Sequence, residues 1–228
     1  MSEVDASRAV GSRDLARRLG IDESRVRRLA ASGKLPGRKV GHDWLFELDL
    51  VGDRVSNVRS PGRPFSQANA LGLLYLASGA EAGWLAPAVR SRLQRRLGTS
   101  ISKLLPRLRS RAERRVYRAP DALLEKLRSD PEFILSGVSA SDHYGMRIVA
   151  PGLIEGYADP ALIDRVAYRY GLERVGERDA NLIVHVAPRG FLPRSRFMPR
   201  AVVAADLADH SDARTRRVGE DLLARRGR

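Results

Sequence analysis

The stretch Ser12–Glu47 constrains the fold most, because helix signals and turn signals alternate along it at short intervals. Leu15 and Leu19 stand four residues apart, which predicts one apolar edge of a short helix. Ser12 is suited to cap the start of this helix, and Gly20 is suited to end it in a left-handed conformation. The stretch is therefore expected to begin with a short amphipathic helix.

A second helix is predicted directly after the first, with Asp22 as its cap and Gly33 as its end. Val26, Leu29 and Ala30 form its expected buried stripe, because they follow the spacing of one helix face. Four polar residues are left on the other faces of this helix: Ser24, Arg25, Arg27 and Arg28. The second helix is therefore expected to be basic where it faces outward.

Two short runs, 38–40 and 44–47, have the character of strands, and Gly41, His42 and Asp43 are typical of the turn between them. We take His42 as a turn residue and not as a metal ligand. Two short helices joined at a glycine, with a basic second helix, are typical of a helix-turn-helix. The second helix would then enter the major groove of DNA, and the two-stranded ribbon would be a wing.

A longer pattern runs through the same segment. Its residues are, in order, Ser12, Ala16, Leu19-Gly20, Val26, Leu29, Gly33, Lys34-Leu35-Pro36, Lys39-Val40-Gly41 and Trp44. This pattern resembles the winged helix-turn-helix of the excisionase and MerR-type DNA-binding family. The resemblance implies that Ser24, Arg25, Arg27 and Arg28 face the groove. It also implies that Arg38, Lys39 and His42 face the backbone or the minor groove.

The charge of the chain favours an anionic partner. The net charge is +14 and the pI is about 11.1, as in many nucleic-acid-binding proteins. Residues 1–60 contain 12 Lys or Arg against 9 Asp or Glu, and residues 131–228 contain 15 against 13. Residues 61–130 contain 14 against 5, so most of the excess charge lies outside the N-terminal pattern.

Several protein classes are excluded or disfavoured. The chain has no cysteine, which excludes disulfides, cysteine-ligated zinc and thiol chemistry. Its four histidines are far apart, and no stretch approaches the roughly 20 apolar residues of a membrane span. The N-terminus lacks both the basic start and the apolar run of a signal peptide. We therefore expect a cytoplasmic protein with no membrane contact, no metal and no cofactor.

The sequence gives no support for catalysis. A nucleotidyltransferase site needs a Gly-Ser turn followed by two carboxylates one residue apart, which would hold Mg²⁺. Ser136-Gly137 has only Asp142 near it, and Gly137-Val138-Ser139 lacks the closing glycine of a hydrolase elbow. A glycine-rich phosphate loop ending in Gly-Lys-Ser or Gly-Lys-Thr is also missing. We therefore expect no enzyme.

A domain boundary is predicted at the run Pro61 to Pro64, which separates a first domain, 1–60, from a basic helical domain, 61–130. Helices are expected at 66–77, 87–97 and 101–108, the last kinked at Pro106, and a strand at 114–118. These elements would form either a second winged helix or a helical domain with a solvated basic surface, and both alternatives stay open. DNA contact here would come from Arg92, Arg95, Arg96, Lys103, Arg107, Arg114 and Arg115.

The remainder, 131–228, predicts a small α+β domain for dimerisation or for contact with a partner or an effector. Strands are expected at 152–158 and 182–186. Helices are expected at 160–170, 200–207 and 213–223, and residues 189–199 read as a loop. The fold class of the whole chain is therefore expected to be α+β.

One phrase in this last domain runs from Leu135-Ser136-Gly137-Val138-Ser139-Ala140 to His143-Tyr144-Gly145. With Ala205-Asp206-Leu207 further on, it resembles the AbiEi-family antitoxins and transcriptional regulators. The phrase departs from the family at Ser141, where a leucine is usual, and by one residue inserted between the histidine and the glycine. The resemblance implies an autorepressing protein encoded beside a nucleotidyltransferase-like toxin. The alternative is that Ser136, Ser139 and His143 cap or pack a short helix.

We therefore predict a sequence-specific DNA-binding transcriptional regulator, and specifically an autorepressing, antitoxin-like repressor. Its partner would be double-stranded DNA, while a homodimer and a toxin partner stay open. One alternative is an excisionase-like architectural protein that assists recombination by bending DNA. Another is a nucleotide-processing enzyme built on the C-terminal domain.

Overall fold

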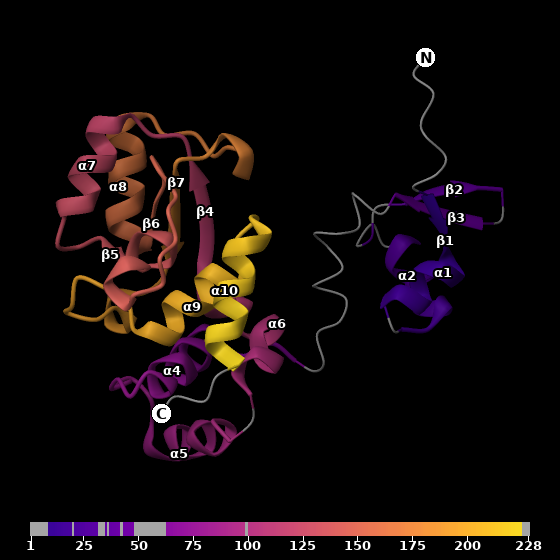
Figure 1. Ribbon diagram of the computed structural model, residues 1–228, viewed down its shortest axis with the longest axis horizontal. Helices are drawn as coiled ribbons and strands as arrows, with labels where there is room; N and C mark the ends of the chain where they lie inside the picture. Colours follow the sequence, from indigo (N-terminus) through magenta and orange to yellow (C-terminus); the bar gives the residue numbers. More distant parts are fainter. Residues whose placement is uncertain are drawn as a thin grey trace. The chain divides into compact units, whose positions relative to one another are not determined.

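The computed structural model describes residues 9–19, 21–31, 35, 37–41, 43–47, 63–98 and 100–224. The chain divides into two compact units, unit 1 at Met1–Arg63 and unit 2 at Pro64–Arg228 (Figure 1). Each unit contains helices and strands, which confirms the predicted α+β class. Several predictions lie outside the described residues: those for Gly20, Gly33, Lys34, Pro36 and His42, and the boundary residues Pro61 and Gly62.

The described residues of unit 1 form two helices and a three-stranded antiparallel sheet. The helices are α1 (Ser12–Leu19) and α2 (Glu23–Ala31), and the strands are β1 (Ala9–Gly11), β2 (Arg38–Val40) and β3 (Asp43–Glu47). The strand order is β1-β3-β2. Strand β1 precedes the predicted stretch and is held in the sheet because Val10 pairs with Phe46 and packs on the core.

The core of unit 1 is formed by the predicted apolar stripes. Leu15 and Leu19 of α1 face Val26 and Ala30 of α2, and all four side chains are buried. Leu35 and Phe46 complete this cluster, and Leu29 packs at its edge. The periodicity of the sequence therefore placed the inward faces of both helices correctly.

Unit 2 is larger, and its elements follow one another along the chain. Its helices are α4 (Gln67–Ala77), α5 (Pro87–Arg96), α6 (Leu105–Leu108), α7 (Asp121–Ser129), α8 (Pro160–Tyr170), α9 (Arg200–Ala208) and α10 (Ala213–Ala224). Its strands are β4 (Glu113–Tyr117), β5 (Ile134–Leu135), β6 (Ile154–Ala158) and β7 (Leu182–Val186). Its 3₁₀ turns are η2 (Ile101–Leu104), η3 (Arg109–Arg111), η4 (Gly137–Ala140), η5 (Asp142–Tyr144), η6 (Glu177–Asp179) and η7 (Arg189–Phe191).

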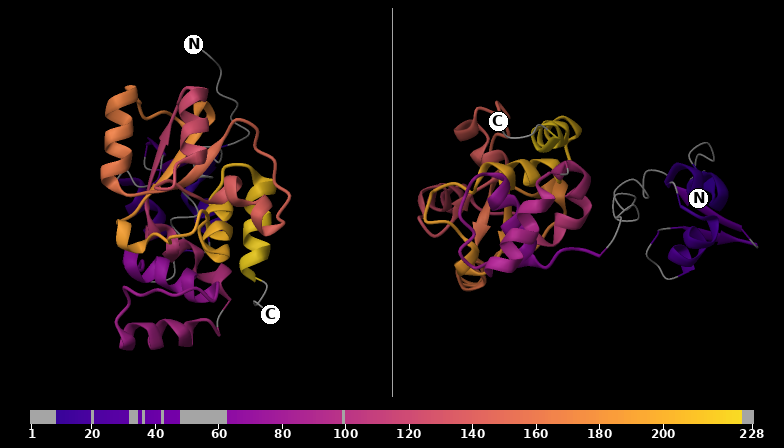
Figure 2. Two further views of the ribbon diagram at one scale, coloured as in Figure 1. Left: turned by 90° about the vertical axis from the view of Figure 1, so that its left-hand side faces the viewer. Right: turned by 90° about the horizontal axis from the view of Figure 1, so that it is seen from below.

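The four strands form one sheet in the order β4-β7-β6-β5. Strands β6 and β7 are parallel and are joined by α8, whereas the other two pairs are antiparallel. Helix α8 packs against β7, and Figure 1 shows α7 and α8 together on one side of the sheet. The turn η4 packs against β6 and α9, and Figure 2 shows the same layers from two further directions.

This sheet corrects the predicted boundary near residue 130, and it also rules against a second winged helix, which was one of the two alternatives for residues 61–130. Strand β4 was assigned to the middle domain, yet it pairs with β7 along its whole length, from Glu113↔Val186 to Tyr117↔Leu182. Helix α4 likewise packs against α9. The pairing follows from burial, because β7 is buried along its length and needs a partner on each side. Residues 64–228 therefore share one core, and β4 is a strand of its sheet and not a wing.

Candidate nucleic-acid interface

Helix α2 separates a buried face from a basic outward face. Val26 is fully buried and Ala30 is 6% exposed, whereas Ser24, Arg25, Arg27 and Arg28 are all exposed. With 3.6 residues per turn, Ser24 and Arg28 lie opposite Val26, and Arg25 and Arg27 flank them. The four predicted groove residues of α2 therefore share its solvent side.

The arginines of α2 differ in their ionic partners. Arg27 donates from Nη2 to Oε1 of Glu23 at 2.7 Å, one helical turn earlier. Among the residues that the structure describes, neither Arg25 nor Arg28 forms an ion pair. The charges of Arg25 and Arg28 are therefore available to an external anion, while that of Arg27 is partly balanced.

The β2–β3 hairpin adds a second basic element to unit 1. Arg38, Lys39 and Val40 of β2 are all exposed, and β2 lies at the edge of its sheet. On β3, Phe46 is fully buried, and its ring stacks on that of Trp44 at 6.3 Å between centroids. The core thus holds the hairpin through β3 and leaves the side chains of β2 exposed.

Helix α5 carries exposed arginines in unit 2. Its Leu93 is buried, whereas Arg92, Arg95 and Arg96 are exposed, as is Lys103 in the following turn. The guanidinium carbons of Arg96 and Arg107 lie 5.6 Å and 4.6 Å from the centroid of the Phe65 ring. These distances are within the range of a cation–π contact, so Phe65 brings Arg96 and Arg107 together.

Arg114 and Arg115 were predicted near DNA, but both are engaged in the fold. Arg115 donates to Asp164 at 2.6 Å and to Glu113 at 3.0 Å, and Arg114 pairs with Glu177. The hydrogen bonds from Arg115 and Arg174 lower the pKa of Glu113 to about 2. Carboxylates of unit 2 thus balance both charges, and we leave Arg114 and Arg115 out of the interface.

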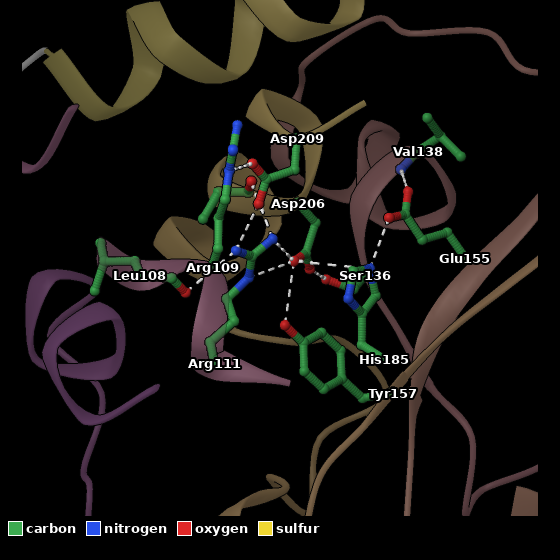
Figure 3. A network of polar contacts seen from close by, with 11 residues as sticks. Leu108, Arg109, Arg111, Ser136, Val138, Glu155, Tyr157, His185, Asp206 and Asp209 are labelled. Atoms are coloured by element: carbon green, nitrogen blue, oxygen red, sulfur yellow. Dashed lines mark hydrogen bonds and ion pairs between the residues drawn. The ribbon is translucent and has the colours of Figure 1, made fainter. Parts of the chain in front are cut away.

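A buried polar network occupies the centre of unit 2, and sequence reasoning missed it (Figure 3). Arg111 donates from Nε and Nη2 to Oδ1 of Asp206 at 2.8 Å and 2.6 Å, and from Nη1 to Asp209 at 2.7 Å. Tyr157 donates to Oδ1 of Asp206 at 3.1 Å, and Ser136 donates to Oδ2. Asp206 therefore joins three segments of the chain at one carboxylate.

The network continues to the two central strands. Oε1 of Glu155 on β6 lies 2.8 Å from Nε2 of His185 on β7, and Oε2 accepts from the Val138 N–H at 3.0 Å. Burial has the largest single effect and opposes ionisation of Glu155. The hydrogen bond and charge of His185, the Val138 N–H and the charge of Arg114 together outweigh it and keep the pKa of Glu155 below its usual value. Glu155 and His185 are each 2% exposed.

This network lies inside the fold. Its central residues are almost fully buried, and within the described ranges no cluster of His, Cys, Asp or Glu is arranged to hold a metal ion. The antitoxin-like phrase supplies part of it, because Ser136 contacts Asp206 and Ser139 accepts from the Glu155 N–H at 2.9 Å. His143 is exposed and stacks on Phe197 at 4.0 Å. Ser136, Ser139 and His143 thus all contact other residues of unit 2.

None of the helices in the described parts of the chain combines the length and the apolarity of a membrane span. Compared with known proteins, the chain matches no family model, no curated protein and no solved structure.

Proposed function

We propose that the chain is a sequence-specific DNA-binding transcriptional regulator in which α2 contacts base edges in the major groove. The observation that carries this function is the outward face of α2, where Arg25 and Arg28 are exposed and have no ionic partner among the described residues. A guanidinium can form two parallel hydrogen bonds with O6 and N7 of guanine, the commonest base-specific contact. Two such groups on one rigid helix suit this task.

The order of elements in unit 1 supports the proposal. Helix α1 packs against α2, and the β2–β3 hairpin follows α2 along the chain. A winged helix-turn-helix needs this order, because the first helix supports the second and the hairpin contacts the backbone beside it. Arg38 and Lys39 of β2 would then contact phosphates, which position the protein without selecting a sequence.

The exposed arginines of α5 would act on the same duplex as phosphate contacts. Arg92 and Arg95 lie on a helix without acidic residues, in the segment with the largest excess of positive charge. Contacts of this kind release counterions and give affinity that depends on salt concentration. A regulator of this type binds chromosomal DNA, so we infer that it acts in the cytoplasm. A toxin partner is not part of this proposal, because Ser136 and Ser139 of the antitoxin-like phrase make contacts inside unit 2.

Replacing Arg28 with alanine is expected to weaken binding to the specific duplex by about 1–3 kcal/mol, because one bidentate base contact is lost. Binding of the full chain to duplexes enriched from a randomised pool, with random DNA as competitor, measures this effect. The matched control is Arg17→Ala on α1, which removes the same charge where Asp14 already pairs with it at 3.4 Å. Arg27→Ala should have a smaller effect than Arg28→Ala, because Glu23 already holds Arg27.

The same titrations test the function as a whole. A specific regulator should prefer its enriched site over random DNA by about a thousandfold or more. Equal losses on specific and random DNA for Arg28→Ala would contradict the role of α2. If the unmodified chain shows no preference for any sequence, only a general affinity for phosphate remains and the proposal is refuted.

Replacing Arg95 with alanine is expected to weaken binding to all sequences alike. One phosphate contact fewer should reduce the slope of log K against log salt by about one. The slope is measured by repeating the titration over a series of salt concentrations. Arg214→Ala on α10, another exposed arginine outside the proposed interface, is the control and should leave the slope unchanged.

A further inference from the structure

A groove on unit 2 lies beside the C-terminal end of α4 and the segment 190–200 that leads into α9. Its volume is about 780 Å³, within the range of roughly 300–1,000 Å³ that is typical of small-molecule sites. Four aromatic side chains line it: Tyr75, Trp84, Tyr144 and Phe197. Two arginines, Arg194 and Arg200, also line it.

The polar atoms of three of these aromatic side chains are used inside the protein. Tyr75 donates its hydroxyl to the Phe191 carbonyl at 2.8 Å, and Trp84 donates Nε1 to the Ala68 carbonyl at 3.1 Å. The Tyr144 hydroxyl donates to the Met198 carbonyl at 2.8 Å. These bonds fix the ring positions before any ligand arrives. Tyr75 is 3% exposed and packs edge-on against Trp84 at 4.9 Å between ring centroids. The partly exposed rings of Trp84, Tyr144 and Phe197 therefore offer a preformed apolar surface to a planar group.

The two arginines give the groove a positive charge. Both are exposed, and in the described part of the chain neither forms an ion pair. The charge of Arg200 reaches the Tyr144 hydroxyl: burial raises the pKa of this hydroxyl, and the charge of Arg200 opposes the rise. Glu81 is the acidic residue of the lining, so the arginines outnumber it.

We propose that this groove binds a nucleoside phosphate, with the base against the aromatic side chains and the phosphate on Arg194 and Arg200. The chemistry selects this class because a neutral ring would leave two guanidinium groups unpaired, and a bare phosphate would leave the apolar rings in water. The ligand is either a free nucleotide or the terminal nucleotide of a single strand, which present the same groups. This site is independent of duplex binding by unit 1.

The test is isothermal titration of the full chain with AMP, GMP, CMP and UMP, and with a short single-stranded oligonucleotide. At least one of these is expected to bind saturably. Adenosine and ribose 5-phosphate each lack one half of the AMP ligand and should bind at least about tenfold more weakly than AMP if AMP binds, since each lost contact is worth about 1.5 kcal/mol. Saturation by a mononucleotide identifies the free ligand as the source, and saturation by the oligonucleotide alone identifies a strand end.

Variants locate the binding. Arg194→Ala and Arg200→Ala should each weaken the ligand about tenfold, because each removes one charged hydrogen-bond donor. Arg214→Ala on α10 removes an exposed arginine that does not line the groove, and it should change nothing. Absence of saturable binding by every probe overturns the proposal, as does binding that both groove variants leave intact. Duplex titrations of Arg28→Ala are scored separately, so either function can fail alone.

Discussion

Replacement of Arg111 by alanine is expected to lower the free energy of unfolding of unit 2 by about 3–5 kcal/mol, the usual cost of breaking a buried ion pair. The side chain of Arg111 is 3% exposed, and that of Asp206 is fully buried. Burial disfavours the charge of Arg111, but Asp206 and Asp209 outweigh this effect and hold the pKa of Arg111 above its usual value. Alanine would leave the buried Asp206 carboxylate without its guanidinium partner, whereas Asp209 would keep its contact with Arg109 at 3.1 Å.

Native-state hydrogen exchange of the β6 and β7 amides measures this loss, because it reports on unit 2 without a contribution from unit 1. The control is Arg118→Ala, an exposed arginine whose contact is a 3.3 Å hydrogen bond to the Asp179 carbonyl, and it should change stability by less than about 0.5 kcal/mol. A cycle of Arg111→Met with Asp206→Asn should give a coupling energy of about 1–3 kcal/mol. Coupling near zero would show that the pair does not hold unit 2 together.

Elements with strong local signals could be predicted from the sequence. Helix α8 has the predicted bounds, because Asp159 caps its start, Pro160 fits its first turn and Gly171 ends it at φ 58°. Strand β7 also has its predicted bounds, since Leu182–Val186 is a compact apolar run rich in β-branched residues. Pro106 was expected to disturb a helix, and the segment is indeed divided into η2, α6 and η3.

Pairing between distant segments could not be predicted in this way. Nothing local in Glu113–Tyr117 indicates that its partner is Leu182–Val186, so β4 was assigned to a separate domain. Helix α7 was missed, although Leu123, Leu124 and Leu127 stand at helical spacing just after Pro120. Local sequence patterns thus predict individual helices and strands better than they predict how these elements pack together.

In the candidate interface, too, local features could be predicted from the sequence, whereas contacts between distant residues could not. Periodicity alone placed the arginines of α2 on the outer face, because Val26 and Ala30 determine the inner one. The four-residue spacing of Glu23 and Arg27 on one helix is also a local signal for their ion pair. Periodicity could not show that Asp164 holds Arg115 from 49 residues away. The buried network did leave a signal, since Glu155 and His185 are ionisable residues within otherwise apolar strands. Such residues are rarely buried without a partner.

Replacement of Gly137 by alanine is expected to destabilise unit 2 by at least about 3 kcal/mol, for two separable reasons. The first is the backbone, because Gly137 has φ 47°, where an L side chain costs roughly 1–2 kcal/mol. The second is space, because an added Cβ would lie 1.8 Å from Oε2 of Glu155. The carboxylate would have to move, and its hydrogen bonds with His185 and the Val138 N–H would be lost.

Gly145→Ala separates these two contributions. Gly145 has φ 68°, but a Cβ there would meet nothing within 4 Å, so this variant carries the backbone cost without the clash. Hydrogen exchange in β6 and β7 should therefore show a clearly smaller loss for Gly145→Ala than for Gly137→Ala. Removal of the carboxylate in Gly137→Ala/Glu155→Ala should make the glycine replacement cost no more than it does at Gly145. Equal losses at the two glycines would mean that the Glu155 carboxylate does not occupy the space beside Gly137, and that the network is not anchored there.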